Sequence, residues 1–335
     1  MCKAFRRQHL FLLAGLLGVN ILAFAKQSIV PSRVVLQHGG TVEQRERIGA
    51  TLTAVMQETN RLHVGRGNFD TLRPYCTPEG FEALKKLVEQ TGFFSTIVEY
   101  RTNLIATPAG QYEVRGINVR VNMAGTKGDP IQYLVFAINA FGKITNAKFA
   151  IEEKYYAQIM KDGRTKNDLF NRQVILNLME EFRTAHNRKD IDYLEKIYSD
   201  DALIIVGQVL QKKQKRNDEP DAFDLSDLGG EKIRFVKKSK QQYIEGLRRV
   251  FQLNSFVKVF FYDFEIQQHW LYKDIYGVNV RQRWNSSNYN DHGYLFLMID
   301  FRNPDQPLIH IRSWQPKPFD DGSVLRLSNF PVIKR

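Results

Sequence analysis

The feature that most constrains this chain is an internal repeat. Residues 116–120 read GINVR, and residues 277–281, which lie 161 positions later, read GVNVR. The same spacing holds in the next segment, where residues 133–138 (YLVFAI) correspond to residues 294–299 (YLFLMI). Two matches at one spacing indicate that the chain contains two copies of one structural unit.

The spacing between the copies is shorter further upstream. Residues 70–72 (DTL) match residues 192–194 (DYL) at a distance of 122 positions. The second copy therefore carries an insertion of about 39 residues between these points. We expect the two copies to superpose, with residues 116–120 and 277–281 on equivalent strands.

The first 25 residues are organised like a signal peptide. A basic start precedes the apolar run 10–22, and residues 23–25 (AFA) form the small-x-small pattern that signal peptidase cleaves. We therefore expect cleavage after Ala25 and an exported protein, either periplasmic or secreted. The apolar run is shorter than the roughly 20 residues that cross a membrane. No later segment is as long, so we expect no transmembrane segment in the mature chain.

Cysteine content and charge narrow the choice of partners. Cleavage would remove Cys2 and leave Cys76 as the only thiol, so no intrachain disulfide can form in the oxidising compartment. The net charge is +12, and loss of Lys3, Arg6 and Arg7 lowers it to +9. A basic exported protein favours anionic lipid, polysaccharide or an acidic partner, and no nucleic acid partner is expected. The same charge also serves solubility alone.

Apolar periodicity predicts the same order of elements in both copies. In the second copy, helical spacing over 167–187 is followed by a short helix capped by Asp190 and by a third helix around 243–251. Strand-like runs then follow in each copy, at 95–107, 112–123, 131–141 and 144–151, and at 256–268, 276–284, 294–301 and 308–314. Helices followed by an antiparallel meander predict an α+β fold.

These patterns divide the chain into a signal peptide (1–25), a flexible lead (26–40), a reduced domain (41–151), a linker (152–166) and a full domain (167–335). The linker is polar and partly helical, which favours a fixed relation between the domains. The full domain carries a charged insertion around 208–239, where basic and acidic blocks alternate. It is interpreted either as a solvated hairpin extension or as an arm that docks a partner.

Two further segments carry a family resemblance. Residues 185–192 (AHNRKDID) and 198–202 (YSDDA) resemble the passage from the first helix to the first strand in the nuclear transport factor 2-like, or SnoaL-like, superfamily, and residues 240–251 resemble its third helix. The resemblance covers 167–335 and extends to 41–151 through the repeat. It implies two cone-shaped domains, each with helices packed on a curved antiparallel sheet and an apolar interior that can hold a ligand. The superfamily includes isomerases, dehydratases and epoxide hydrolases, and also binding modules without enzymatic activity.

Catalytic patterns are missing from the sequence. Ketosteroid isomerase uses an aspartate base opposite a tyrosine and a neutral carboxylic acid, and we find no counterpart of that motif. Zinc-protease, paired Cys-x-x-Cys, nucleophile-elbow and phosphate-loop motifs are also absent. We therefore predict no catalytic residue, no metal site and no cofactor.

One pair of carboxylates has the spacing of an acid–base pair. Asp263 and Glu265 lie two apart in a predicted strand, on the face opposite the even-numbered aromatic and aliphatic residues of 260–266. Arg281 and Arg283 have the same spacing on the next strand. Opposite charges across neighbouring strands are also a common arrangement on a solvent-facing side.

Aromatic and polar side chains gather in one hairpin and on the last strand. Residues 284–292 (WNSSNYNDH) connect two long strands, and His310, Arg312 and Trp314 alternate with isoleucines on the last strand. The predicted ligand- or partner-binding residues are Trp284, Tyr289, His292, His310 and Trp314. The competing interpretation is an Asn/Ser-rich hairpin with packed aromatics and a structural histidine.

The leading hypothesis is an exported, non-enzymatic protein that binds a small molecule, a glycan or an envelope protein. The alternative is a small-molecule hydrolase, isomerase or dehydratase that uses the interior of the second domain. A buried, unpaired carboxyl group facing that interior would favour the enzyme, because burial shifts its pKa. A filled core with an exposed aromatic patch would favour the binding module. The oligomeric state does not follow from the sequence.

Overall fold

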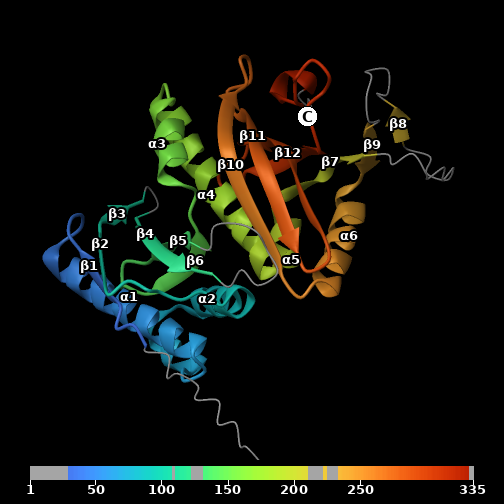
Figure 1. Cartoon of the computed structure of the whole chain (residues 1–335). Coiled ribbons are helices and arrows are strands. Elements are labelled where there is room, and N and C mark those ends of the chain that lie inside the picture. The colour runs from blue at the N-terminus through green and yellow to red at the C-terminus, as the bar shows by residue number, and fades with distance from the viewer. Residues whose placement is uncertain (1–28, 108–109, 122–130, 210–221, 225–232, 332–335) are drawn as a thin grey trace, which may run out of the picture.

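The computed structural model describes residues 29–107, 110–121, 131–209, 222–224 and 233–331. Within them, helices pack against mainly antiparallel sheets, so the predicted α+β class is confirmed (Figure 1). There are two separate large hydrophobic cores, one formed by residues 34–149 and the other by residues 151–314. The predicted signal peptide lies outside the described residues.

The first unit has a four-stranded sheet. Its helices are α1 (Val42–His63), the 3-10 helix η1 (Phe69–Tyr75) and α2 (Pro78–Thr91). Its strands are β1 (Arg33–Leu36) and β2 (Glu99–Thr102), which pair in parallel, and β3 (Leu104–Ala106), β4 (Tyr112–Arg120), β5 (Ile131–Ile138) and β6 (Ile144–Phe149), which form an antiparallel sheet in that order. The apolar faces of α1 and α2 share one core with this sheet.

The second unit has a seven-stranded sheet. Its helices are α3 (Glu153–Lys161), α4 (Lys166–Arg188), α5 (Ile191–Lys196), α6 (Lys240–Leu253) and the short 3-10 helix η2 (Leu327–Asn329). Its strands are β7 (Tyr198–Val209), β8 (Ala222–Asp224), β9 (Ile233–Lys238), β10 (Val257–Gln268), β11 (Ile275–Ser286), β12 (Asn290–Asp300) and β13 (Leu308–Gln315). Their order in the sheet is β10-β11-β12-β13-β7-β9-β8, and only the β13–β7 pair is parallel. The strands β8 and β9 come from the predicted insertion, whose other residues between 210 and 232 lie outside the described part.

Short polar residues determine where the helices begin. The Thr41 and Ser239 hydroxyls accept backbone N–H groups from Gln44 and Gln242, whose side-chain oxygens accept the N–H of the cap residue in return. Asp190, the predicted cap of α5, accepts a backbone N–H from the first turn of that helix. These caps are readable from the sequence because they depend on residues three positions apart.

The predicted flexible lead 26–40 needs correction. Residues 33–36 form β1, in which Val34 and Leu36 are buried. Their apolar side chains join the first core, and the parallel pairing with β2 satisfies the backbone of the strand. A partner more than 60 residues away decides this strand, so local sequence patterns do not reveal it.

A bulge in β10 changes which residues share a face. The pairing with β11 shifts between Tyr262 and Glu265, and Asp263 takes a positive φ of 54°. Phe261 is buried in the second core before the bulge, and Phe264 is buried there after it. The predicted common face for the even-numbered residues of 260–266 is therefore wrong, because the extra residue reverses the alternation.

The two repeat segments lie on corresponding strands with different pairing. Residues 116–120 belong to β4 and residues 277–281 to β11, each the second strand from an edge of its sheet. Asn118 lies opposite Tyr133, whereas Asn279 lies opposite Phe296, two residues beyond the position that the repeat spacing gives. A slip of two residues keeps every side chain on its original face.

Helix α4 lies between the two units. Phe182 on one face belongs to the second core. On another face, the Thr184 hydroxyl accepts the Phe149 N–H at 2.9 Å, and Glu180 accepts the Ile151 N–H at 2.9 Å. The predicted linker 152–166 contains α3, and Ile159 in α3 is buried in the second core, so this segment is packed against the second unit.

Candidate functional site

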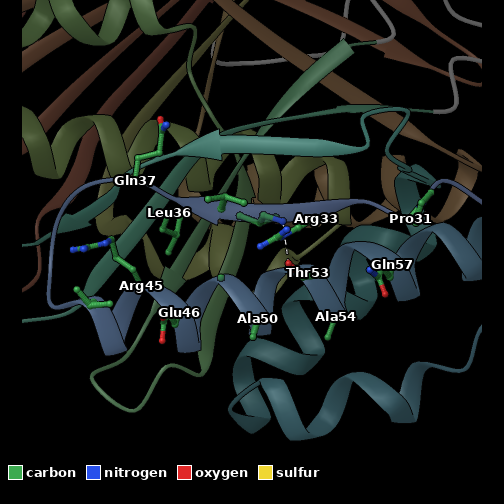
Figure 2. A pocket seen from close by; sticks show the side chains of 14 residues that line it. Pro31, Arg33, Leu36, Gln37, Arg45, Glu46, Ala50, Thr53, Ala54 and Gln57 are labelled. Atoms are coloured by element: carbon green, nitrogen blue, oxygen red, sulfur yellow. Dashed lines mark hydrogen bonds between the residues drawn. The ribbon is translucent and has the colours of Figure 1, made fainter.

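A groove with a volume of about 880 Å³ lies between β1 and α1 of the first unit. Figure 2 shows Arg33 on the strand and Arg45 and Glu46 on the helix lining it. The Val34 N–H donates to Thr53 Oγ1 at 2.9 Å, which ties the strand to the helix. Among the described residues, no buried polar atom that lacks a hydrogen-bond partner lines this groove. The groove therefore offers no unpaired buried polar group of the described residues for chemistry.

The second unit contains an interior polar cluster, formed by His186, Tyr198, Asp291, Arg312 and Trp314. His186 comes from α4, Tyr198 from β7, Asp291 from β12, and the last two from β13. Four of them have buried side-chain atoms without a hydrogen-bond partner in the described chain: the Tyr198 hydroxyl, Asp291 Oδ1, Arg312 Nε and Nη1, and Trp314 Nε1. Folded proteins pair nearly all their buried polar atoms. This concentration therefore marks the candidate site.

Arg312 is a buried cation at the centre of this cluster. His310 is an extra residue that bulges from β13, and beyond it Arg312 lies opposite Leu297, a residue of the second core. Only 7% of Arg312 is exposed, and it forms no ion pair with any residue in the described ranges. Its guanidinium carbon lies 4.9 Å from the centroid of the Tyr243 ring on α6. A cation–π contact of this kind offsets only part of the cost of burying the charge.

The Trp314 indole occupies space that a glycine leaves free. A Cβ atom on Gly293 would lie 2.9 Å from Trp314 Cζ2 and 2.5 Å from the Gln315 carbonyl oxygen. Gly293 stands between Asp291 and Leu295 on the same face of β12. The missing side chain thus lets the indole lie against β12 at Gly293.

Asp291 has an environment that disfavours its ionised form. It lies opposite Trp284 across the β11–β12 pair. Burial raises the pKa of Asp291, while the Tyr289 hydroxyl and the charge of Arg312 act in the opposite direction. Burial, followed by the charge of Asp291, raises the pKa of Tyr289 to about 12, so this hydroxyl keeps its proton and can donate it in a hydrogen bond.

His186 presents a neutral ring to the interior. Its Nδ1 lies 2.7 Å from the Phe182 carbonyl oxygen, which can only accept, so Nδ1 carries the proton and Nε2 is the acceptor. Burial lowers the pKa of His186 to about 4, against the opposing effect of this bond, and the charge of Arg312 lowers it further. The ring centroid lies 5.8 Å from that of Trp284 and 6.2 Å from that of Phe251, both in edge-to-face contact.

Tyr198 contributes a hydroxyl that stays protonated. Burial raises the pKa of Tyr198 well above its ordinary value, and the side chain is 1% exposed. Its ring meets the Tyr243 ring with centroids 5.6 Å apart. The cluster therefore offers three kinds of hydrogen-bond donor: a hydroxyl, an indole N–H and a guanidinium. Its acceptors are the imidazole nitrogen of His186 and the carboxyl oxygen of Asp291. Aromatic side chains surround these groups.

The structure brings together only some of the residues selected from the sequence. Trp284 and Trp314 face the second core, and Tyr289 stands at the hairpin beside Asp291. His292 is exposed and lies opposite Arg283 on the other face of the hairpin. His310 lies at the other end of β13, with Nε2 at 3.3 Å from Asp300 Oδ2.

The sequence selection missed four members of the cluster, namely His186, Tyr198, Asp291 and Arg312. His186, Asp291 and Arg312 all lie in segments whose composition is unusual, namely residues 185–192, residues 284–292 and the last strand. Their convergence depends on the bulge at His310 and on the packing of α4. A polar residue inside an otherwise apolar face of a strand or helix is the signal that could have identified them.

The carboxylate pair of β10 forms surface ion pairs. Asp263 lies 3.6 Å from Arg281, as predicted for charges on neighbouring strands. Glu265 instead pairs with Arg326 at 3.1 Å. Both carboxylates are about half exposed, where such pairs contribute little to stability.

The described residues contain no group of three or more His, Cys, Asp or Glu side chains that could hold a metal ion. No helix within the same ranges has the length and apolar character needed to cross a bilayer.

Several solved structures are distantly similar to the chain. An NTF2-like protein from Cytophaga hutchinsonii is 14% identical with a TM-score of 0.30, covering 43% of this chain and 97% of that one. A candidate scytalone dehydratase from Novosphingobium aromaticivorans is 11% identical with a TM-score of 0.33, covering 48% and 94%. A candidate dehydratase of the NTF2-like family from Streptomyces avermitilis is 11% identical with a TM-score of 0.28, covering 40% and 87%. No model of a known family and no curated protein matches the chain. The similarities are too distant to carry an activity.

Proposed function

We propose that the second unit is a small-molecule-binding module whose ligand contacts the interior polar cluster. The observation that carries this proposal is the set of buried donor and acceptor atoms on four of its side chains that lack partners in the described chain. A buried polar atom without a hydrogen bond costs about 1–3 kcal/mol. A ligand that pairs with these atoms recovers that free energy on binding.

The surroundings of the cluster support the same function. Small-molecule sites are mainly apolar, with a few converging polar groups that orient the ligand. Here Tyr243, Phe251 and Trp284 supply the aromatic surface. The residues 284–292, selected from the sequence as a binding loop, contribute Trp284 and Asp291 to this region.

Removal of the Tyr198 hydroxyl tests the proposal directly. Tyr243 and Arg312 act on the pKa of Tyr198, but no bond of normal hydrogen-bond geometry joins its hydroxyl to the described residues, so Tyr198→Phe should leave the thermal midpoint of unfolding unchanged or raise it. Tyr276→Phe is the matched control, since the Tyr276 hydroxyl is also buried but donates to Asp168 at 3.0 Å and accepts from Gln268 at 2.9 Å. The control should lose about 1–2 kcal/mol of stability. An equal loss in both variants would mean that ordered water satisfies Tyr198, and the proposal would fail.

Binding is measured on the same two variants. Phenol, indole, benzoate and benzamide are presented to the full chain, and saturation-transfer NMR detects which of them bind. Tyr198→Phe should weaken at least one bound probe about tenfold, which corresponds to one hydrogen bond of about 1.4 kcal/mol. Tyr276→Phe should bind like wild type. Absence of binding by all four probes would contradict the binding function.

An enzymatic role is the second candidate, and one observation favours it. Asp291 is a carboxyl group with a raised pKa in a buried site, and the neutral His186 ring offers Nε2 as a base. Such a pair suits proton transfer in a hydrolase, isomerase or dehydratase. The test compares wild type with a His186→Gln variant that still binds the probes. If wild type converts a bound probe and the variant does not, the second unit is an enzyme. If wild type converts no probe, the enzymatic role is rejected and the binding function remains.

The proposal also covers the location of the protein and the origin of its two units. We infer that the chain is exported, in the periplasm or outside the cell, and that its two units arose by tandem duplication of one nuclear transport factor 2-like unit. The signal-peptide pattern supports export, and the repeat on β4 and β11 supports duplication. Amino-terminal sequencing of exported protein should begin at Lys26. A start at Met1 would contradict cleavage.

A further inference from the structure

We propose that the ligand of the interior polar cluster is a small aromatic carboxylate, whose carboxylate group binds the Arg312 guanidinium. This inference rests on the proposed binding function and specifies its ligand class. The positive charge of Arg312 has no counter-charge among the other side chains of the cluster.

Arg312 requires an anion in the folded protein. A guanidinium remains charged at every physiological pH. Burying a charge costs several kcal/mol unless a counter-charge compensates it. The described residues provide no ion pair to Arg312, and its Nε and Nη1 atoms have no hydrogen-bond partner. Each of these two nitrogens carries an N–H group that a carboxylate oxygen can accept.

Asp291 does not fill this role. It lies near enough for the charge of Arg312 to act on it, yet the two side chains do not form an ion pair and Asp291 Oδ1 is unpaired. Its burial disfavours the ionised form. The cluster therefore keeps a cation whose counter-charge does not come from the described residues.

The number of charges selects a monoanion. Arg312 is the only permanent cation of the cluster. A phosphate dianion would keep one negative charge that no cation of the cluster balances, which is unfavourable in a buried site. A carboxylate needs one guanidinium, and the Tyr198 hydroxyl and the Trp314 indole N–H can donate to it as well.

The aromatic surroundings select the rest of the ligand. Tyr243 lies under the guanidinium, and Phe251, His186 and Trp284 form a run of edge-to-face rings beside it. Planar rings pack favourably on such surfaces. An aromatic carboxylate places its charge on Arg312 and its ring among these side chains.

Four probes on three proteins test the inference. Benzoate, its neutral analogue benzamide and inorganic phosphate are titrated into the full-length wild type, Arg312→Gln and Arg283→Gln, and the dissociation constants are measured by calorimetry. Arg283 is exposed on the outer side of β11, so its replacement removes the same charge without touching the cluster. Phenol, an uncharged ring, is the probe for general binding.

We expect wild type to bind benzoate at least tenfold more tightly than benzamide or phosphate. Arg312→Gln should lose this preference, and Arg283→Gln should retain it. Equal affinities for benzoate and benzamide in wild type, which do not depend on any variant folding, would overturn the carboxylate assignment. If phenol binds in that case, the binding module stands. If phenol and all other probes fail to bind, the proposed function itself is refuted. Tighter binding of phosphate than of benzoate would also overturn the inference.

Discussion

At the residue scale, His186 couples the candidate site to the stability of the second unit. The ring is buried between Phe182, Phe251 and Trp284, and its charged form loses the solvation that water would provide. The pKa of His186 falls from 6.5 to about 4 for this reason. The same burial that keeps Nε2 available as an acceptor therefore penalises protonation of the folded state.

The sign of the resulting pH dependence follows from proton binding. Between pH 6.5 and about 4 the unfolded chain binds a proton at His186 that the folded chain does not. Stability from this residue should be complete above about pH 6.5 and be lost as the pH falls towards 4, by up to about 3 kcal/mol. Urea unfolding between pH 4 and 7 measures it.

The His186→Phe variant isolates this contribution. It keeps an aromatic ring that cannot ionise, so its stability should depend less on pH in this window than that of wild type. His292→Gln, which changes an exposed histidine, is the control and should follow wild type. Parallel pH profiles for all three proteins would show that His186 titrates normally.

At the element scale, the end of α4 is set by a residue in the left-handed conformation. Lys189 is the C-cap of α4 with φ 56°, and its Nζ donates to the carbonyls of Asn254 and Ser255 at 2.6 and 3.1 Å. Glycine is the usual residue at such a position because a Cβ atom crowds the backbone. The two carbonyl contacts hold a lysine there, and they fix the end of α4 against the segment that leads into β10.

Two replacements of Lys189 isolate the cost of the left-handed backbone from the loss of the ammonium contacts. Lys189→Ala and Lys189→Gly both lose the ammonium contacts, so they differ only in the backbone. The glycine variant should be more stable by about 1 kcal/mol, measured by chemical denaturation. Equal stabilities would indicate that the helix end relaxes out of the left-handed conformation in the alanine variant.

At the scale of the whole molecule, a buried ionic network joins the two units. Glu180 on α4 is fully buried and contacts Arg115 on β4 and Lys148 on β6, the latter at 3.4 Å. Glu113 adds a second carboxylate to the same two cations. Because Glu180 belongs to the second unit and its partners to the first, the units should unfold together.

Loss of this carboxylate should weaken the connection. Removing one partner of a buried ionic network leaves uncompensated charge, so Glu180→Gln should destabilise the protein by about 3 kcal/mol. Calorimetry should resolve a single transition for wild type and a broadened or split one for the variant. Glu195→Gln, at a half-exposed position, is the control. An unchanged single transition in Glu180→Gln would mean that apolar packing alone joins the units.

The sequence by itself determined the helices, most of the strands and the α+β class. Apolar spacing fixed α4 to within one residue at each end, and Asp190 marked the start of α5. The aromatic and polar pattern of the hairpin and the last strand also selected Trp284 and Trp314, which face the second core. These features depend on residues within one or two turns of each other, so local patterns contain the information.

The tertiary structure alone decided which polar side chains are buried and which of them meet. The polar residues of α4, such as Glu180 and Thr184, resemble a solvent face in the sequence but pack against the first unit. Single extra residues at Asp263 and His310 reverse the alternation of β10 and β13, and the second of these brings Arg312 into the interior with Asp291. The physical reason is that burial and strand register depend on pairings between segments tens of residues apart, and one inserted residue changes the face of every side chain that follows.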